Sequence, residues 1–362
     1  MRVAVVTTWF PDGASPATAP FVVAHATAVA RRHDVTVVHL RLGGRGAVVE
    51  EEYRGLRVVR VPVDPRLPLH ATGALRTLAG LLRPADVVHS MAFSTVGALA
   101  PLTPVIMRRW VHSEHWSGVG FPERVDGPWR RVAGARHLLR LPRRVSAVSS
   151  LLAERITPFT RLDAVEVVPC VVDVPAQPTP APAGGRWGLV AVGGLVPGKR
   201  PLLAVETVRE LVDRGVDVGL TWVGDGPLRT QVEERSRALD VADRVRLVGS
   251  VPPQGVAQHL ARNALFFLPT AFETFLVSGA EALAGGRPVV LTGEGGFVDY
   301  VDETVGTVVA DDSVGGLAEA LVAARARFDG VPPEHFRAAV LPRLGSEAIG
   351  RLFDDFYGRA LS

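Results

Sequence analysis

The 362-residue sequence is poor in cysteine and contains no apolar run long enough to cross a membrane. Its single cysteine, Cys170, excludes an internal disulfide and any zinc site built from several cysteines. A membrane-spanning helix needs about 20 consecutive apolar residues. The apolar start at 3–6 is too short even for a signal-peptide core, and Pro11 and Asp12 follow it closely. We therefore expect a cytoplasmic protein whose first strand is buried.

Lysine is almost missing as well. Of the 40 basic residues, Lys199 is the only lysine, so the other 39 are arginine. This excess, together with abundant Ala, Gly, Val and Pro, is typical of a GC-rich bacterial coding bias. The formal net charge is only +3, and no basic motif interleaved with aromatic residues is present, so nucleic-acid binding is not expected. Because this bias places arginine wherever any cation would serve, the lysine at 199 is informative about the chemistry of its position.

Length and composition predict two globular domains of the α/β class. The chain is too long for one ordinary core, and 47% hydrophobic with 21% charged residues is typical of a folded protein. In each half, short Val-rich runs alternate with stretches of helical periodicity, which predicts parallel sheets covered on both faces. Pro- and Gly-rich residues at 175–185 predict a linker. The expected domains are therefore 1–174, joined by the helical tail 347–362, and 186–346.

The expected elements are as follows. In the first half, strands are expected at 2–7, 35–40, 58–61, 87–89, 105–108 and 145–148, with a helix at 21–32. In the second half, strands are expected at 188–192, 218–223, 245–248, 265–268, 289–291 and 307–309, with helices at 202–214, 227–239 and 277–283. Parallel sheets of this kind bind ligands at the carboxyl ends of their strands.

The segment 266–290, FFLPTAFETFLVSGAEALAGGRPVV, carries the strongest candidate chemistry. A buried strand leads into a loop with Glu273, and a helix follows that carries Glu281. The free backbone N–H groups at the start of this helix, near 276–279, form an anion site suited to a diphosphate. Glu273 could then accept hydrogen bonds from sugar hydroxyls, and Glu281 could reach a ribose. Taken singly, Glu273 is also explained as a helix cap and Glu281 as a solvated residue.

The whole segment resembles the glutamate-pair signature of family 4 glycosyltransferases. Four further stretches resemble this family in the same order, which together with the first covers most of 188–321. These are AVGGLVPGKRP (191–201), WVGDGPL (222–228), RVRLVGSVP (244–252) and TGEGGFVDYV (292–301). The resemblance implies a GT-B fold, in which two Rossmann-like domains with parallel sheets face each other across an interdomain cleft. It also implies a retaining, metal-independent hexosyltransferase that uses a nucleotide-diphosphate sugar, with UDP-hexose favoured, and needs no cofactor.

Residue by residue, the resemblance implies that Lys199 contacts the donor diphosphate, Glu273 holds donor-sugar hydroxyls and Glu281 holds the ribose. It also implies that the backbone at 249–251 lines the base. The family usually has arginine where this chain has Gly194, and Arg200 is the nearest cation that could replace it. Leu276 stands where glycine is common, and we expect it to crowd the donor sugar. The remaining predicted donor-binding residues are Gly249, Val251, Thr274, Phe275 and Val277.

The first domain resembles the family less closely. SEHWSG (113–118) looks like the family's Thr-Glu-His segment, which implies that His115 sits beside the anomeric carbon as a catalytic residue. An isolated histidine is also commonly structural. VEVVPCVVD (165–173) looks like the segment that enters the linker. The loop 10–21 occupies the position of the family's Gly-rich diphosphate loop, so Gly13 is a candidate donor-binding residue although the Gly-Gly pair is absent.

The stretch 108–144 holds nine arginines and three tryptophans: Trp110, Trp116 and Trp129. One interpretation is a basic, aromatic surface for an anionic membrane or a phosphorylated acceptor, which would place the protein peripherally at the inner membrane face. A solvated, arginine-rich helix produced by coding bias explains the pattern equally well.

Two alternatives to a transferase stay open. One is a catalytically degenerate partner protein that only binds nucleotide sugar, and the other is a GT-B sugar-nucleotide epimerase. The acceptor is not predicted beyond a hydroxyl on a lipid, a polysaccharide or a specialised metabolite. No metal site is expected, since no Asp-x-Asp motif follows a strand.

Overall fold

The computed structural model describes residues 1–12, 19–64, 66–125, 127–172, 177–182 and 184–362. The chain divides into two compact units, Met1–Val171 with Leu344–Ser362, and Val172–Arg343. These divisions fall three residues before those expected from the sequence. Residues 179–180 of the expected linker are tied to the second unit by the buried guanidinium of Arg287. Its nitrogens donate to the Thr179 and Pro180 carbonyls at 2.6 and 3.1 Å.

The first unit is built on an eight-stranded sheet with the order β3-β4-β2-β1-β5-β6-β7-β8. All neighbours are parallel except β3, which pairs antiparallel with β4 at the edge, so the sheet is mixed and not purely parallel as the sequence suggested. Its strands are β1 (Arg2–Thr7), β2 (Asp34–Leu42), β3 (Val49–Tyr53), β4 (Leu56–Val63), β5 (Val87–Met91), β6 (Trp110–Glu114), β7 (Arg144–Ala147) and β8 (Glu166–Val167).

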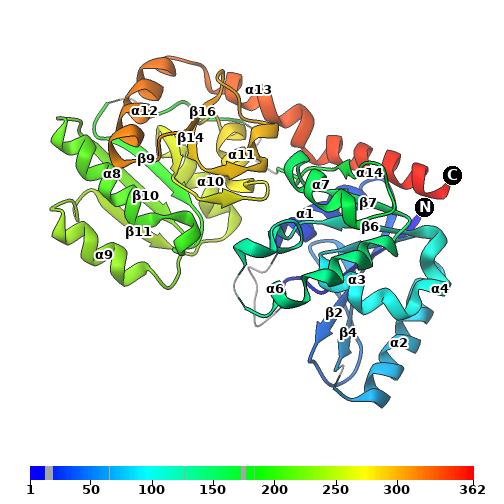
Figure 1. Cartoon of the computed structure of the whole chain (residues 1–362). Coiled ribbons are helices and arrows are strands. Elements are labelled where there is room, and N and C mark those ends of the chain that lie inside the picture. Colours follow the sequence, from blue (N-terminus) through cyan, green and yellow to red (C-terminus); the bar gives the residue numbers. More distant parts are fainter. Residues whose placement is uncertain (13–18, 65, 126, 173–176, 183) are drawn as a thin grey trace. The chain divides into compact units, whose positions relative to one another are not determined.

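Two helices from opposite ends of the chain cover one face of this sheet. α1 (Pro20–Ala30) packs beside α14 (Ser346–Leu361), as Figure 1 shows. Both bury apolar side chains against β1, β2 and β5, with Val29 and Phe353 fully covered. Arg32 and His33, just after α1, both reach the Asp354 carboxylate of α14. The C-terminal helix thus belongs to the first unit because its apolar stripe completes that core.

The helices that connect the strands of the first unit are mostly short. α2 (Pro68–Leu82) packs against β4, and α3 (Phe93–Leu99) packs against β5. The others are α4 (Thr103–Ile106), α5 (Ser117–Gly120), α6 (Trp129–Val132) and α7 (Ser150–Ile156).

One expected strand is wrong. The residues at 105–108 were expected to be extended, but they form the end of α4 and a 3₁₀ turn. Pro104 lies in the first turn of α4, where its fixed φ favours a helix. The strand lies at β6 instead, where WVHSE is fully buried. Because it contains a histidine, a serine and a glutamate, this strand is not recognised as an apolar run in the sequence.

The second unit contains a six-stranded parallel sheet with the order β11-β10-β9-β12-β14-β16. Its strands are β9 (Trp187–Val192), β10 (Val218–Val223), β11 (Val245–Gly249), β12 (Leu265–Leu268), β14 (Val289–Thr292) and β16 (Gly306–Val309). A separate two-stranded ladder pairs β13 (Phe272–Glu273) with β15 (Glu294–Gly295). Each expected strand of this half is found, with bounds that agree within one residue.

Helices cover both faces of this second sheet. α8 (Pro201–Asp213), α9 (Arg229–Ala238) and α12 (Val314–Arg327) pack together on one side, and α10 (Pro253–Ala261) packs with α11 (Val277–Ala284) on the other (Figure 1). α13 (Pro333–Leu344) leads back to the first unit. The order of the strands reverses between β9 and β12. At such a switch point the connecting loops diverge, and ligands of open α/β sheets bind there.

Candidate active site

The switch point of the second unit brings two predicted residues together. Lys199 lies in the loop that follows β9, and Glu273 lies in the loop that follows β12. The loops are tied together, because the Gly198 carbonyl accepts from the Ala271 N–H at 2.8 Å and from the Thr270 hydroxyl at 3.2 Å. The shared edge of the sheet therefore places these two side chains side by side.

Lys199 and Glu273 form an ion pair through Nζ and Oε1, and the same carboxylate oxygen accepts the Thr270 hydroxyl at 2.9 Å. The lysine side chain is 23% exposed and the glutamate side chain 11%. The pair is thus half-buried, so its charges are less screened than those of a surface pair. Both charges remain within reach of a ligand at the strand ends.

Helix α11 begins beside this pair with a strained residue. Leu276, the residue before its first turn, has φ 69° and ψ 70°, a left-handed conformation that disfavours a side chain. The Tyr300 hydroxyl lies 2.6 Å from the Leu276 carbonyl and 3.1 Å from the Phe275 carbonyl. The Ser278 hydroxyl donates to the Val192 carbonyl at the end of β9, at 3.1 Å. The amino end of α11, with its positive dipole, is thus fixed at the switch point.

The predicted residues of this helix entry divide by burial. Phe275 and Leu276 are 3% and 5% exposed, so their side chains are packed inside and only their backbone is available to a ligand. A Cβ added at Gly279 would lie 2.9 Å from Cδ2 of Leu276, which places the leucine side chain over the first turn of α11. Thr274, Val277 and Glu281 are half-buried.

The other predicted donor residues lie on neighbouring loops. Gly194 follows β9, and its carbonyl accepts from the Val196 N–H at 2.9 Å. Gly249 ends β11 with φ 82° and accepts from the Gly224 N–H at 2.9 Å, while Val251 is half-buried nearby. Arg200, the candidate replacement for an arginine at 194, pairs with Asp312 in the loop after β16. Its guanidinium is therefore already held by another carboxylate.

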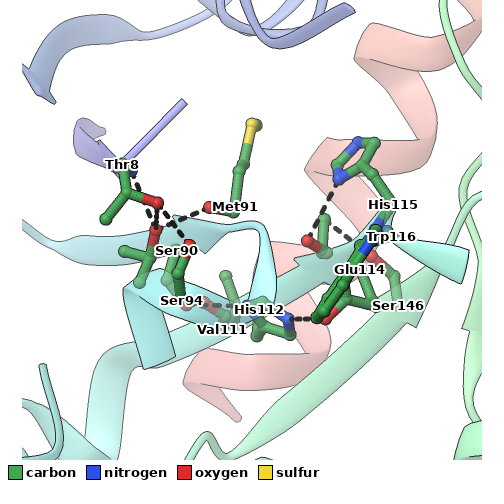
Figure 2. A network of polar contacts seen from close by, with 12 residues as sticks. Thr8, Ser90, Met91, Ser94, Val111, His112, Glu114, His115, Trp116 and Ser146 are labelled. Atoms are coloured by element: carbon green, nitrogen blue, oxygen red, sulfur yellow. Dashed lines mark hydrogen bonds and ion pairs between the residues drawn. The ribbon is translucent and has the colours of Figure 1, made fainter. Parts of the chain in front are cut away.

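The first unit has its own switch point, between β1 and β5, and it is lined with polar groups (Figure 2). Thr8 Oγ1 lies 2.5 Å from Ser94 Oγ, so a contact between two hydroxyls joins the loop that follows β1 to the first turn of α3. His115 follows β6, the next strand along. It is 9% exposed, and the Phe21 ring stacks on it with centroids 4.6 Å apart.

A buried network fixes the His115 backbone. The Glu114 carboxylate is fully buried; Oε1 accepts the backbone N–H groups of His115 and Trp116, each at 2.9 Å. Its other oxygen lies 3.2 Å from His112 Nε2, and His112 Nδ1 lies 3.0 Å from Ser90 Oγ. Figure 2 shows this line of contacts running from Ser90 through His112 to Glu114. The turn after β6 is therefore preorganised by charge-assisted hydrogen bonds.

Burial shifts the pKa of several imidazoles of this unit downward. Burial lowers the pKa of His25 to about 4, against a modest opposing effect from its hydrogen bond to Pro169. Burial also holds the pKa of His115 well below its usual range, and the neighbouring histidines lower it further. His89, whose ring nitrogens contact Tyr357 OH at 2.8 Å and Ser113 Oγ at 2.7 Å, is shifted in the same direction and mainly by burial.

Several residues at these two edges were not predicted: His25, His112, Glu114, Thr270, Ser278 and Tyr300. For Glu114 and His112 the sequence did contain a signal. The run HSEHW directly follows Trp110 and Val111, and if it continued the same strand its polar side chains would not be solvated. Tyr300 and Ser278 gave no signal, because each acts through a backbone carbonyl distant in sequence.

The arginine- and tryptophan-rich stretch is only partly a surface. Trp110 is a core residue, fully buried on β6 with its Nε1 donating to Ser90 Oγ at 2.9 Å, so it cannot belong to an aromatic surface. Trp116 and Trp129 are half-buried, with ring centroids 5.0 Å apart. Arg136 caps carbonyls and lies 4.0 Å over the Phe159 ring. These contacts are local and identify no partner.

Gly13 lies outside the described residues. Within the described part of the chain, no three His, Cys, Asp or Glu side chains gather in a way that could hold a metal ion. In the same part, no helix has the length and apolar character needed to span a bilayer.

Comparison with known proteins places this geometry in a family. The description "Glycosyltransferase Family 4" matches residues 19–175, and "Glycosyl transferases group 1" matches 186–326. Among solved structures, Anabaena Alr3699/HepE in complex with UDP superimposes with a TM-score of 0.79 at 17% identity, over 99% of this chain and 100% of that one. The lipopolysaccharide outer core galactosyltransferase WaaB gives 0.73 at 15%, over 99% and 100%. The fold is therefore GT-B, as expected from the sequence.

Relatives of known activity agree. A GDP-mannose-dependent alpha-mannosyltransferase of Mycolicibacterium smegmatis is 30% identical over 265 residues, 68% of each chain. The 2-deoxystreptamine glucosyltransferase of Streptomyces kanamyceticus is 30% identical over 194 residues, 50% of this chain and 48% of that one. The chain thus matches about half the length of the latter, and 30% of the length of a Niallia circulans relative. This chain belongs to family 4 of the GT-B glycosyltransferases.

Proposed function

We propose that this glycosyltransferase moves a hexose from a nucleotide-diphosphate sugar to an acceptor hydroxyl, with retention of configuration and without a metal ion. The observation that carries the proposal is the Lys199–Glu273 pair beside the amino end of α11, at the switch point of the second sheet. A cation and a helix N-terminus suit the diphosphate of such a donor, and a carboxylate suits the hydroxyls of its sugar.

The diphosphate would take the cationic groups of this edge. Loss of the sugar leaves negative charge on the β-phosphate, and Lys199 with the N–H groups of the first α11 turn would stabilise it. Lys199 would then leave Glu273 for the phosphate, which frees the carboxylate to accept hydrogen bonds from sugar hydroxyls. In the free protein the ion pair keeps both side chains in place.

A metal is dispensable in this scheme because Lys199 and the helix dipole supply the positive charge. In the proposed step the acceptor oxygen attacks the anomeric carbon on the face that the diphosphate leaves. The new C–O bond forms as the old one breaks, and the acceptor proton passes to the departing phosphate oxygen. The reaction therefore needs no pair of carboxylates of the kind that glycoside hydrolases use.

UDP-hexose is the favoured donor and the acceptor class is open. A solved relative of the same fold carries UDP, whereas a sequence relative is named for its dependence on GDP-mannose. The nucleotide base would lie along Gly249–Val251 and the ribose near Glu281. The half-buried hydroxyls and aromatic rings at the strand ends of the first unit would meet the acceptor.

A thermal-shift screen with UDP, GDP, TDP and their sugars tests donor binding, and donor-dependent transfer in EDTA tests the reaction. We expect one nucleotide class to raise the melting temperature and Glu281→Ala to abolish that shift. Product analysis by proton NMR would report the anomeric configuration. Transfer that requires an added divalent ion, or an inverted product, would refute the mechanism. Donor binding without transfer to any acceptor would favour a non-catalytic partner protein.

A further inference from the structure

Two histidines distant in sequence share a hydrogen bond in the interior of the first unit. His25 of α1 is fully buried, and its Nδ1 lies 3.1 Å from Nε2 of His115. The other nitrogen of His25, Nε2, lies 3.0 Å from the Pro169 carbonyl oxygen. The other nitrogen of His115, Nδ1, lies 3.2 Å from the Ser113 carbonyl oxygen. The two rings thus form a chain of three polar contacts with a carbonyl at each end.

These three polar contacts outnumber the protons that two neutral imidazole rings carry. Each of the three contacts needs one proton on a ring nitrogen, because a carbonyl oxygen can only accept. Two neutral imidazoles carry two protons, and a third would require one ring to be charged. Both rings have a pKa depressed by burial. At neutral pH one of the three contacts therefore holds no proton.

Among the described residues, the surroundings supply no charge that would change this count. His89 and His112, on β5 and β6, are the nearby titratable rings and disfavour a positive charge on His115. The Glu114 carboxylate is occupied by two backbone N–H groups and by His112. Phe353 of α14 lies edge-on to His25 with centroids 5.4 Å apart, and Phe21 of α1 stacks on His115. The pair thus lies among neutral or already satisfied groups.

The two terminal carbonyls differ in what else they accept. The Ser113 oxygen already accepts the backbone N–H of Ala92 at 3.3 Å, so it stays satisfied without His115. For the Pro169 oxygen, no donor other than His25 is found among the described residues. Leaving a buried carbonyl without a donor is unfavourable, so the proton on His25 belongs on Nε2. Its Nδ1 is then an acceptor, which calls for the proton of His115 on Nε2.

From this geometry we propose that His25 is a positioning residue that fixes the tautomer of His115, leaving Nδ1 of His115 as an acceptor for a ligand hydroxyl. His115 is the imidazole of this network that reaches the surface, with 9% exposure against 0% for His25, His89 and His112. Its Nδ1 faces a carbonyl oxygen without a proton between them, an arrangement that a hydroxyl proton would relieve. The ligand group implied is thus a hydroxyl and not a phosphate oxygen. That this hydroxyl belongs to a sugar rests on the proposed function.

The tautomer can be read without any assay of activity. Long-range ¹H–¹⁵N correlation spectra of protein labelled with ¹⁵N-histidine distinguish protonated from bare ring nitrogens, and loss of signals in His115→Gln assigns that ring. We expect His115 to be protonated at Nε2 in the wild type. In His25→Leu the acceptor is gone, and the proton should move to Nδ1 to meet Ser113. His25→Gln should keep the wild-type tautomer, because an amide can donate to Pro169 and accept from His115.

Binding measurements separate this role from simple packing. Calorimetry of the favoured nucleotide and its sugar should show that His25→Leu weakens the sugar nucleotide about tenfold but leaves the nucleotide unchanged. His33→Leu is the matched control, since His33 is also a half-buried imidazole beside α14, bonded to Asp354, and no contact with His115 is found. His33→Leu should change neither the affinity for the nucleotide nor the affinity for the sugar nucleotide. A His115 proton on Nδ1 in the wild type, or an unchanged tautomer in His25→Leu, would overturn the proposal. If the tautomers behave as expected but no sugar is transferred, the proposed function fails and the positioning role stands.

Discussion

The Tyr300 hydroxyl lies 2.6 Å from the carbonyl oxygen of Leu276, and Leu276 is the strained residue that precedes the first turn of α11. A leucine with positive φ persists only where its surroundings enforce it, at a cost of about 1–3 kcal/mol. Tyr300 is fixed in turn against Phe275, with ring centroids 5.2 Å apart. The amino end of α11, the proposed diphosphate site, is therefore held in shape by a side chain that need not touch the ligand.

Tyr300→Phe tests this support. Removing the hydroxyl leaves two buried carbonyls without that donor, so we expect a loss of about 1–2 kcal/mol in the free energy of unfolding. Nucleotide-sugar affinity should fall as well, because the first turn of α11 is then less well fixed. Denaturant titration and calorimetry measure the two effects. Tyr53→Phe, a tyrosine in the first unit, should leave donor affinity unchanged; equal losses in both variants would contradict this role.

Gly279→Ala should destabilise the protein although alanine favours helices. An added Cβ would lie 2.9 Å from Leu276 Cδ2 and 3.2 Å from the Tyr300 hydroxyl, so the buried leucine would have to shift. Overpacking of this kind costs about 1–3 kcal/mol. Gly358→Ala in α14 is the matched control, because nothing lies within 4 Å of its added Cβ. There the gain in helix propensity, about 0.5–1 kcal/mol, should appear alone. Similar shifts in chemical denaturation for both would show that Leu276 has room to move.

Lys199→Met should reduce kcat by about 10²–10³-fold, the size expected when one group that stabilises transition-state charge is lost. Lys199→Arg should recover part of the rate, since a guanidinium keeps the charge but not the compact shape. Steady-state kinetics at saturating donor measure both. Arg235→Met removes one positive charge from the exposed surface of α9 and serves as the charge-matched control. Near wild-type turnover in Lys199→Met would remove this lysine from the mechanism.

Stability should fall as the pH drops from about 6.5 to about 4. The pKa of His25 in the folded protein is about 4, and that of His39 is also lowered to about 4, mainly by burial and then by Arg60. The unfolded chain, with histidine pKa values near 6.5, therefore binds more protons in this window, and the free energy of unfolding rises with pH. Each such histidine contributes a slope of about 1.4 kcal/mol per pH unit.

Denaturant titrations at pH values from 4 to 7 measure that slope. His25→Leu should lower it by about the contribution of one histidine, while an exposed substitution such as Arg235→Met should leave it unchanged. Because carboxylates also titrate at the acid end, the comparison is the difference between variant and wild type. A wild-type slope in His25→Leu would mean that this imidazole does not stay neutral in the folded state.

The sequence predicted the second unit better than the first for a physical reason. In β9, β10, β12 and β14 nearly every residue is apolar, and the glutamates at 273 and 281 stand at fixed positions around α11. Local pattern and tertiary role coincide there. In the first unit, β6 carries a histidine, a serine and a glutamate in its buried interior, so its pattern resembles a loop and the strand was misplaced onto 105–108.

The sequence by itself determined the α/β class, the family and the lone lysine at 199. Each of these depends on composition or on residues near one another along the chain. Only the tertiary structure decided that Lys199 meets Glu273, that Tyr300 holds Leu276 and that His25 meets His115. These contacts join residues 24 to 90 positions apart, brought together because parallel strands and their covering helices end at a common edge. Hydrogen bonds between such groups leave no periodicity in the sequence, and the cysteine-poor, lysine-poor composition gives no hint of them.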